Sequence, residues 1–196
     1  GLFPDWILTF GEFWATQAKF PVERERILSA GFPWLETRAA EFSDMKTQDQ
    51  LLFISQGTVG AELSRFAVDC AHDHRIDHDV VYKLHPGEVG RWREAYPWLV
   101  GSKVQVIGRE PPPLYELFSR SQVQVGVGST AMYEGLYFGL NTYVFETEGS
   151  EALKPLVEAG VAVPIDSVNE LAVRLQQERK KTETRKYFAS DSIKKQ

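Results

Sequence analysis

The sequence is poor in cysteine and has no long apolar run. Its single cysteine, Cys70, excludes an internal disulfide framework and suits a reducing compartment. No apolar stretch approaches the roughly 18 residues that a membrane-spanning helix needs, and no charged-then-apolar signal segment opens the chain. We therefore expect a cytoplasmic protein, with the inner face of the membrane as an alternative place of action.

Basic residues are outnumbered by acidic residues. The chain has 22 Lys and Arg against 27 Asp and Glu, which gives a formal net charge of -5. A protein that binds a phosphate backbone normally presents a basic face. The only basic cluster in this sequence lies at the C-terminus. We expect no nucleic-acid partner.

Several signature motifs are missing. The patterns GxxxxGK[ST] and GxGxxG are absent, and GVGSTA has only two glycines, which argues against an NTPase and a dinucleotide dehydrogenase. His72, His74 and His78 form a cluster, and on a helix the last two would lie one turn apart. Because no HExxH or comparable ligand pattern accompanies them, we interpret the cluster as a solvated helix end. We predict no metal site and no cofactor.

The bulk composition is that of a globular protein. With 196 residues, 43% hydrophobic and 25% charged, the chain suits one good-sized domain. We assign residues 1–181 to this domain, about the first 45 of them as a linker segment, and 182–196 to a charged tail. The tail either frays in solvent or is anchored by Tyr187 and Phe188 onto another domain. Because the chain begins without Met in a strand-like stretch, we expect a fragment of a longer protein.

Short continuous apolar runs alternate with helical patterns about six times, which predicts a doubly wound, Rossmann-like α/β domain with a parallel sheet and helices on both faces. The predicted strands are 5–10, 27–31, 51–55, 79–85, 103–108, 123–127, 141–146 and 161–165. The predicted helices are 61–74, 88–96, 114–121, 129–139, 151–159 and 168–181. We expect the polar stretch 36–49 to be a surface connection.

Polar and glycine residues follow four of these strands. In an open parallel sheet, ligands bind outside the carboxyl ends of the strands, near the switch in strand order. If the sheet is parallel, these residues converge on one edge and form a candidate binding site. They are Gln56, Gly57, Thr58 and Gly60; His85, Pro86 and Gly87; Arg109 and Glu110; and Gly128, Ser129 and Thr130.

The segment 122–144 reads as a strand that feeds a helix through a turn of small residues. Such a turn leaves the first backbone N–H groups of the helix exposed at the positive end of its dipole, where a phosphate can bind. The hydroxyls of Ser129 and Thr130 can add donors. The alternative is that Ser129 only caps the helix. Glu134, in the first turns, either accepts from ribose hydroxyls or is a favourable helix N-terminal charge.

His85 directly ends a strand, and Pro86 restricts it to extended conformations. A histidine held there can stabilise negative charge on a departing nucleotide; alternatively it is a turn histidine bonded to a carbonyl. Lys83 shares a strand face with His85 and is either a diphosphate contact or an ordinary edge lysine. Arg109 and Glu110 flank a stiff proline loop that either supports a base or is a spacer.

Two motifs resemble a known family. KLHPGE is similar to the His-Pro motif, and VGVGSTAMYEGLYFGLNTYVF to the Ser/Thr-rich segment, of the C-terminal, nucleotide-sugar-binding half of GT-B glycosyltransferases. The resemblance is strongest to bacterial surface and capsular polysaccharide enzymes: polysialyltransferases, Kdo-transferase-like enzymes and CDP-glycerol glycerophosphotransferases. It spans residues 4–166, and much of it is shared with UDP-sugar epimerases.

The resemblance implies that His85 contacts the donor phosphate and assists departure of the nucleotide. It also implies that Ser129 and Thr130 bind phosphate and that Glu134 lies near the ribose. The substrate would be a nucleotide-activated sugar or polyol of CMP/CDP or UDP type, bound without a metal. The glycan acceptor and the catalytic base would belong to an N-terminal domain missing here, so the chain alone would bind donor without turnover. The full-length protein could associate peripherally with a membrane.

Two alternatives stay open. One is an epimerase-like enzyme that acts on UDP-sugars. The other is a noncatalytic Rossmann-like interaction module with a blocked phosphate loop, which would bind a protein through exposed aromatic residues. The candidates for that surface are Trp14, Trp34, Trp92 and Trp98, for which ordinary packing is the competing explanation.

Overall fold

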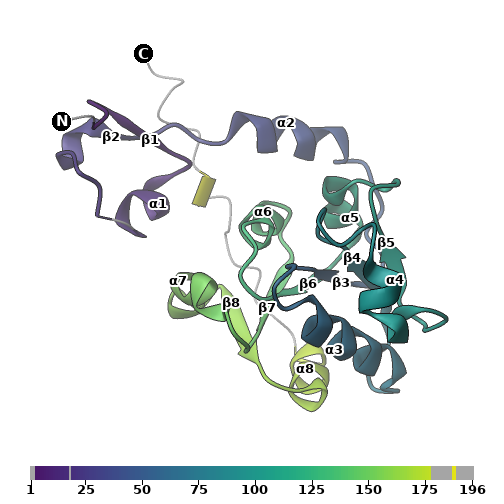
Figure 1. The fold of residues 1–196 in the computed structure, drawn as a ribbon. Helices are drawn as coiled ribbons and strands as arrows, with labels where there is room; N and C mark the ends of the chain where they lie inside the picture. Colours follow the sequence, from purple (N-terminus) through teal and green to yellow (C-terminus); the bar gives the residue numbers. More distant parts are fainter. Residues whose placement is uncertain (1–2, 18, 178–186, 189–196) are drawn as a thin grey trace.

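A computed structural model describes residues 3–17, 19–177 and 187–188. Within them, a parallel sheet of six strands forms the centre, in the order β5-β4-β3-β6-β7-β8 (Figure 1). The strands are β3 (Gln50–Ile54), β4 (Asp79–Lys83), β5 (Gln105–Ile107), β6 (Val123–Gly126), β7 (Asn141–Phe145) and β8 (Ala162–Ile165). The chain steps outward from β3 to β5, then returns to place β6 on the other side of β3. The predicted doubly wound parallel sheet is confirmed.

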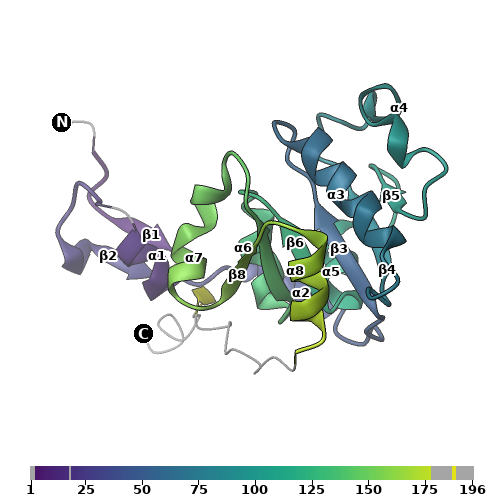
Figure 2. The same ribbon diagram turned by 90° about the horizontal axis from the view of Figure 1, so that it is seen from below.

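Helices cover both faces of the sheet. One face carries α3 (Gly60–His72), α4 (Trp92–Ala95), the 3-10 turn η2 (Pro97–Leu99) and α8 (Val168–Leu175). The other carries α5 (Leu114–Arg120), α6 (Ala131–Tyr137), η3 (Ser150–Leu153) and α7 (Lys154–Glu158). Figure 2 shows α3 and α8 on the same side of the strands.

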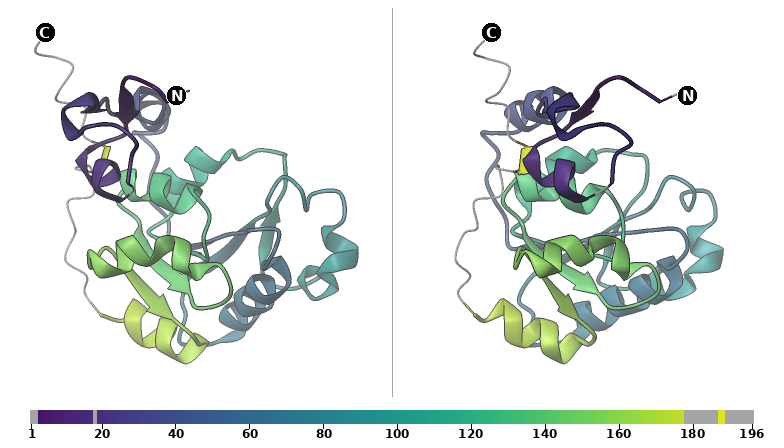
Figure 3. Two further views of the ribbon diagram at one scale, coloured as in Figure 1. Left: turned by 60° about the vertical axis from the view of Figure 1, so that its left-hand side comes forward. Right: turned by 90° about the vertical axis from the view of Figure 1, so that its left-hand side faces the viewer.

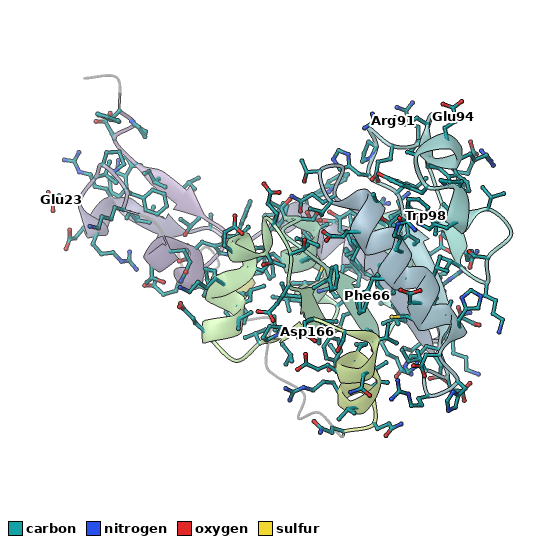
Figure 4. The ribbon with its side chains drawn as sticks, turned by 60° about the horizontal axis from the view of Figure 1, so that its bottom comes forward. Glu23, Phe66, Arg91, Glu94, Trp98 and Asp166 are labelled. Atoms are coloured by element: carbon teal, nitrogen blue, oxygen red, sulfur yellow. The ribbon has the colours of Figure 1, made fainter. Side chains whose placement is uncertain are left out.

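Burial on both faces explains why the strands read as continuous apolar runs. In β3, Leu51 and Phe53 enter the core under α3, while Leu52 and Ile54 enter the opposite core. Phe66 of α3 stacks on Phe145 of β7 at a centroid distance of 4.4 Å. Figure 4 shows Phe66 inside the body of the domain, whereas Arg91 and Glu94 lie at its outer end.

A small N-terminal lobe, residues 3–17 and 19–30, stands beside the main sheet (Figure 3). It contains a parallel pair, β1 (Ile7–Thr9) and β2 (Ile27–Ser29), connected through α1 (Glu12–Gln17) and η1 (Arg24–Arg26). The two strands predicted here therefore exist, although both are shorter than expected.

Helix α2 (Pro33–Glu41) connects this lobe to β3. The surface connection predicted over 36–49 contains residues 36–41 of this helix, which the sequence pattern did not predict. Pro33 occupies the first turn, where proline favours a helix, and Leu35 is completely buried in the core beneath α5 and α6. The polar composition of the stretch concealed this single anchor.

Tyr187 and Phe188 are the only residues of the tail that the structure describes, and both are buried. The Trp14 indole N–H donates to the Tyr187 carbonyl at 2.8 Å, and the Phe188 ring lies 5.8 Å from that of Tyr137. These two residues therefore anchor onto the N-terminal lobe and α6 of the same chain. The rest of the tail, and the predicted end of the last helix at 181, lie outside the described residues.

Helix α3 ends at His72, two residues earlier than predicted. His74 and His78 consequently lie in the following loop, and the expectation that they sit one helical turn apart is wrong. Among the described residues, no cluster of three potential metal ligands occurs. Cys70 is fully buried in α3, and burial raises the pKa of its thiol. No helix in the described part of the chain is long and apolar enough to cross a membrane.

Candidate functional site

The carboxyl ends of β3, β4, β5 and β6 surround a pocket of about 260 Å³. It lies beside the junction of β3 and β6, where the strand order reverses, which is the usual ligand position in such a sheet. The lining combines an apolar floor with polar and cationic groups from all four strand ends. The lining residues are Ile54, Ser55, Lys83, Leu84, His85, Pro86, Val89, Gly108, Arg109, Leu114, Ser129 and Ala131.

His85 projects from a turn that is fixed on both sides. The Leu84 N–H donates to the Ile107 carbonyl at 2.9 Å, so the ladder between β4 and β5 extends to the residue before the histidine. The Gly87 N–H donates to His85 Nδ1 at 3.2 Å. Since Nδ1 is the acceptor, the proton of the neutral ring resides on Nε2. The exposed side chain therefore presents Nε2 as a hydrogen-bond donor.

Two cationic side chains accompany the histidine. Lys83 Nζ donates to the Gly108 carbonyl across the β4–β5 edge, and partial burial lowers the pKa of this lysine. Arg109 is exposed and contributes to the pocket wall at the end of β5. The pocket thus has positive charge on the β5 side of His85, which suits an anionic ligand.

Ser129 also lines the pocket and lies two residues before α6 begins. Its Oγ accepts from the Ala131 N–H at 3.3 Å, so this hydroxyl also serves the local turn. The cap position of α6 is occupied by Thr130, whose side chain makes no capping bond. Gln56 Oε1 accepts from the Gly128 N–H at 3.0 Å. This bond ties the loop after β3 to the loop after β6, across the switch point.

Gly128 must be small because its neighbours are close. A Cβ at this position would lie 2.5 Å from the Gly149 carbonyl oxygen. Gly57 is also close to the site: a Cβ there would be 3.7 Å from His85 Nδ1. Gly128 therefore allows its loop to approach the loop after β7 closely, whereas the space at Gly57 would admit a Cβ.

Other candidates lie apart from the pocket lining. Thr58, Thr130 and Glu110 are exposed on the same rim. Glu134 instead accepts a hydrogen bond from the Tyr115 hydroxyl at 2.5 Å, between α5 and α6. Burial, reinforced by this bond, raises the pKa of Tyr115 to about 12.

Sequence reasoning missed Glu88, which is fully buried beneath the histidine turn. Its Oε2 accepts from the His85 N–H at 2.7 Å, and its Oε1 accepts from the Tyr96 hydroxyl at 2.6 Å and the Ser55 hydroxyl at 3.0 Å. Burial raises the pKa values of Tyr96 and of Tyr82, which also contacts Ser55. The only sequence signal was a glutamate three residues after the histidine in KLHPGE.

Two larger hollows lie at the opposite edge of the sheet, where the strands begin. Their volumes are about 280 and 350 Å³, and they share Thr47, Ser119 and Phe138. Among the described residues, neither is lined by a charged side chain. We therefore place the anion site at the carboxyl edge despite its smaller volume.

Most of the tryptophans have ordinary packing roles. Trp14, Trp92 and Trp98 are partly buried against the two cores, and the Trp98 indole donates to Ser64 Oγ at 3.0 Å. Trp34 on α2 differs, because 60% of it is exposed. The expected aromatic surface is thus reduced to one of its four candidates.

No protein-family model and no curated protein matches the chain. Solved structures do. The UDP-GlcNAc 2-epimerase from Methanocaldococcus jannaschii is 16% identical with a TM-score of 0.57, covering 87% of this chain and 54% of that one; it has also been solved in complex with UDP-GlcNAc and UDP. The glycotransferase of kitacinnamycin is 18% identical, with a TM-score of 0.55 and coverage of 88% and 46%.

The wall teichoic acid polymerase TagF is 14% identical with a TM-score of 0.55, covering 88% of this chain and 48% of that one. This chain therefore spans about half the length of the solved structures it matches. At such identities the likeness shows the fold alone, an α/β Rossmann-like domain with helices on both sides of a parallel sheet.

Proposed function

We propose that this chain is the donor-binding domain of a GT-B glycosyltransferase that transfers a glycosyl or polyol-phosphate group in bacterial surface or capsular polysaccharide biosynthesis. The observation that carries the proposal is the pocket at the switch point, which His85, Lys83, Arg109 and Ser129 line together. An imidazole, two cations and a hydroxyl around one hollow are suited to a nucleoside diphosphate.

The pocket is small for a whole nucleotide-sugar. Its 260 Å³ lies just below the roughly 300–1,000 Å³ typical of small-molecule sites. We therefore assign it to the phosphates and adjoining ribose of the donor, with the transferred group extending out of the open side. Gln56, Gly57 and Gly128 adjoin the pocket without lining it and would support its phosphate end. Pro86 fixes the histidine, and Thr58, Thr130, Glu110 and Glu134 would contact the donor only at its periphery.

His85 would act on the leaving group. In the displacement, an acceptor oxygen forms a bond to the activated atom of the donor while the bond from that atom to the terminal phosphate oxygen breaks. Negative charge then develops on the departing nucleotide. The Nε2–H of His85 donates to a phosphate oxygen, and Lys83 and Arg109 offset the charge, so the transition state is stabilised more than the ground state. The proton of the acceptor hydroxyl goes to a base outside this chain.

The N-terminal lobe supports a further unit for the acceptor. In β1 and β2, Leu8 and Leu28 pair in register on the face that α1 leaves uncovered, and they are 68% and 47% exposed. Trp6, which lies two residues before Leu8 and just outside β1, is 56% exposed. Parallel sheets normally have both faces covered, and the matched structures are about twice the length of this chain. We propose that a second domain packs on this face and supplies the acceptor site.

The likeness to the epimerase favours a second candidate, a UDP-sugar epimerase-like domain. The donor site would be the same, and carboxylates on the other half would perform the chemistry. A noncatalytic module is less well supported, because the predicted sign of that module is a blocked pocket at Ser129, and Ser129 instead lines an open one.

Calorimetric titration with CMP, CDP, UMP and UDP tests the proposal. We expect a diphosphate to bind more tightly than its monophosphate, because it carries more charge toward Lys83 and Arg109. His85→Ala and Ser129→Ala should each weaken binding roughly 10- to 100-fold, the cost of about 1.5–3 kcal/mol for a hydrogen bond to a charged group. Ser119→Ala, in the hollows at the opposite edge, is the matched control and should bind like the parent. If no nucleotide binds at millimolar concentration, or all three variants behave alike, the proposal fails.

A further inference from the structure

Glu88 is a fully buried carboxylate directly beneath the candidate catalytic histidine. Among the described residues it forms no ion pair, so neutral donors must satisfy its oxygens. A buried carboxylate without such partners would be strongly destabilising. Three donors, the Ser55 hydroxyl, the Tyr96 hydroxyl and the His85 N–H, bind Glu88. This set of contacts indicates a role that an apolar residue at position 88 could not fill.

Glu88 and His85 hydrogen-bond to each other in both directions across the histidine turn. The Glu88 N–H donates to the His85 carbonyl at 2.9 Å, and the His85 N–H donates back to Glu88 Oε2 at 2.7 Å. The Gly87 N–H between them donates to the imidazole Nδ1. Backbone and ring of His85 are therefore held by the same four-residue turn.

The other oxygen connects this turn to the rest of the domain. Oε1 accepts from Ser55, which directly follows β3, and from Tyr96, which follows α4. Ser55 Oγ lies 2.8 Å from the Tyr82 hydroxyl, whose oxygen is 3.1 Å from the Gly60 carbonyl oxygen in α3. Because Ser55 donates to Glu88, the single Tyr82 proton serves Ser55 or Gly60. The histidine turn is thus fixed relative to β3, β4, α3 and α4 through one side chain.

We propose that Glu88 is a positioning residue for His85. It holds the 85–88 turn in the form in which Nδ1 accepts from Gly87 and Nε2 directs its proton toward the phosphate of the donor. The identity of that target rests on the proposed function. The positioning itself rests only on the contacts of Glu88, so the two ideas fail separately.

The test measures the imidazole itself. On the parent chain, at a pH where the ring is neutral, ¹⁵N NMR of the histidine rings should show the proton of His85 on Nε2. The His85 amide should exchange slowly with solvent although its side chain is exposed. Glu88→Ala should mix the two ring tautomers, accelerate exchange of that amide and weaken binding of UDP or CDP about tenfold, as for one lost charge-assisted contact. Glu88→Gln retains an acceptor for the His85 N–H and should restore the parent tautomer.

Tyr96→Phe is the control for a purely structural role. It removes one bond to Glu88 Oε1 but leaves the bond from His85, so stability should fall while the tautomer and affinity stay within about twofold of the parent. A folded Glu88→Ala with the parent tautomer and affinity overturns the inference. If Glu88→Ala does not fold, rapid exchange of the His85 amide in the parent, or a proton on Nδ1, overturns it instead. If the parent binds no nucleotide, the proposed function fails and the tautomer measurement still decides the role of Glu88.

Discussion

At the scale of single residues, Gly60 shows how tightly the Glu88 network is packed. A Cβ at Gly60 would lie 2.1 Å from Glu88 Oε1 and 2.3 Å from the Tyr96 hydroxyl oxygen. Gly60→Ala should therefore lower the free energy of unfolding by about 1–3 kcal/mol, the usual cost of overpacking, despite the better helix propensity of alanine. Urea denaturation measures this. Gly90→Ala, with open space around its Cβ, should change stability by less than about 0.5 kcal/mol; equal effects of the two substitutions would contradict the packing described.

The buried phenols predict a loss of stability at alkaline pH. Burial raises the pKa values of Tyr82 and Tyr96, and raises that of Tyr115 to about 12. An unfolded tyrosine has a pKa near 10, so the folded state binds these protons more tightly. Their contribution is complete below about pH 10 and is lost as the pH rises toward the folded pKa values. Urea midpoints should fall steeply above about pH 10, and Tyr115→Phe should make the fall shallower; a flat profile would contradict the burial of these groups.

At the scale of elements, α2 depends on one side chain. Leu35 is fully buried, while its neighbour Trp34 is 60% exposed and has the guanidinium of Arg38 over its ring at 5.6 Å. Leu35→Ala should cost about 2–5 kcal/mol in the free energy of unfolding. Trp34→Ala should cost only about 0.5–1 kcal/mol, the worth of an exposed cation–π contact. Thermal or urea unfolding distinguishes the two, and a larger loss from Trp34→Ala would show that α2 packs by its other face.

The elements also show what the sequence could and could not predict. Strands buried on both faces tend to be continuous apolar runs, so β3 and β4 were predictable from their sequence. In β6 valines alternate with Gln124 and Gly126, although Gln124 is also buried. Helix α2 was not predictable, because a single buried leucine among charged residues leaves little periodicity. Helix α3 ends earlier than predicted because the Asp73 carboxylate turns to bind the Arg75 guanidinium, at 2.6 Å. The spacing of apolar residues in the sequence does not reveal such a local ion pair.

The candidate site also has a part that the sequence predicts and a part that it does not. Parallel strands bring their carboxyl ends to one edge, so the meeting of His85 and Ser129 at one pocket followed from the predicted topology. The Glu88 network did not, because Ser55, Tyr82 and Tyr96 are distant in sequence and only the packing of α3 and α4 joins them. Glu134 was selected for its helix position, which says nothing of the Tyr115 hydroxyl that contacts it.

At the scale of the whole molecule, Phe188 connects the tail to the N-terminal lobe. Its ring lies 6.1 Å from Trp14, 6.4 Å from Phe32 and 5.8 Å from Tyr137. Phe188→Ala should loosen the lobe, because the strand pair β1–β2 is too small to be stable alone. Hydrogen exchange at the amides of β1 and β2 should accelerate while the six-stranded sheet stays protected. Val173→Ala, at an exposed position of α8, should leave both unchanged; unaltered exchange in the lobe after Phe188→Ala would show that the tail does not hold it.

The central claim is that a nucleoside diphosphate binds at the carboxyl edge of the sheet, and backbone NMR of the chain titrated with UDP and CDP tests it most directly. The account predicts that the amide resonances of 55–57, 83–85, 87–88, 108–109 and 128–131 shift together with one affinity, because these residues form or adjoin the pocket. Shifts confined to the opposite edge, around Thr47, Ser119 and Gly139, or no shifts at saturating nucleotide, would contradict it.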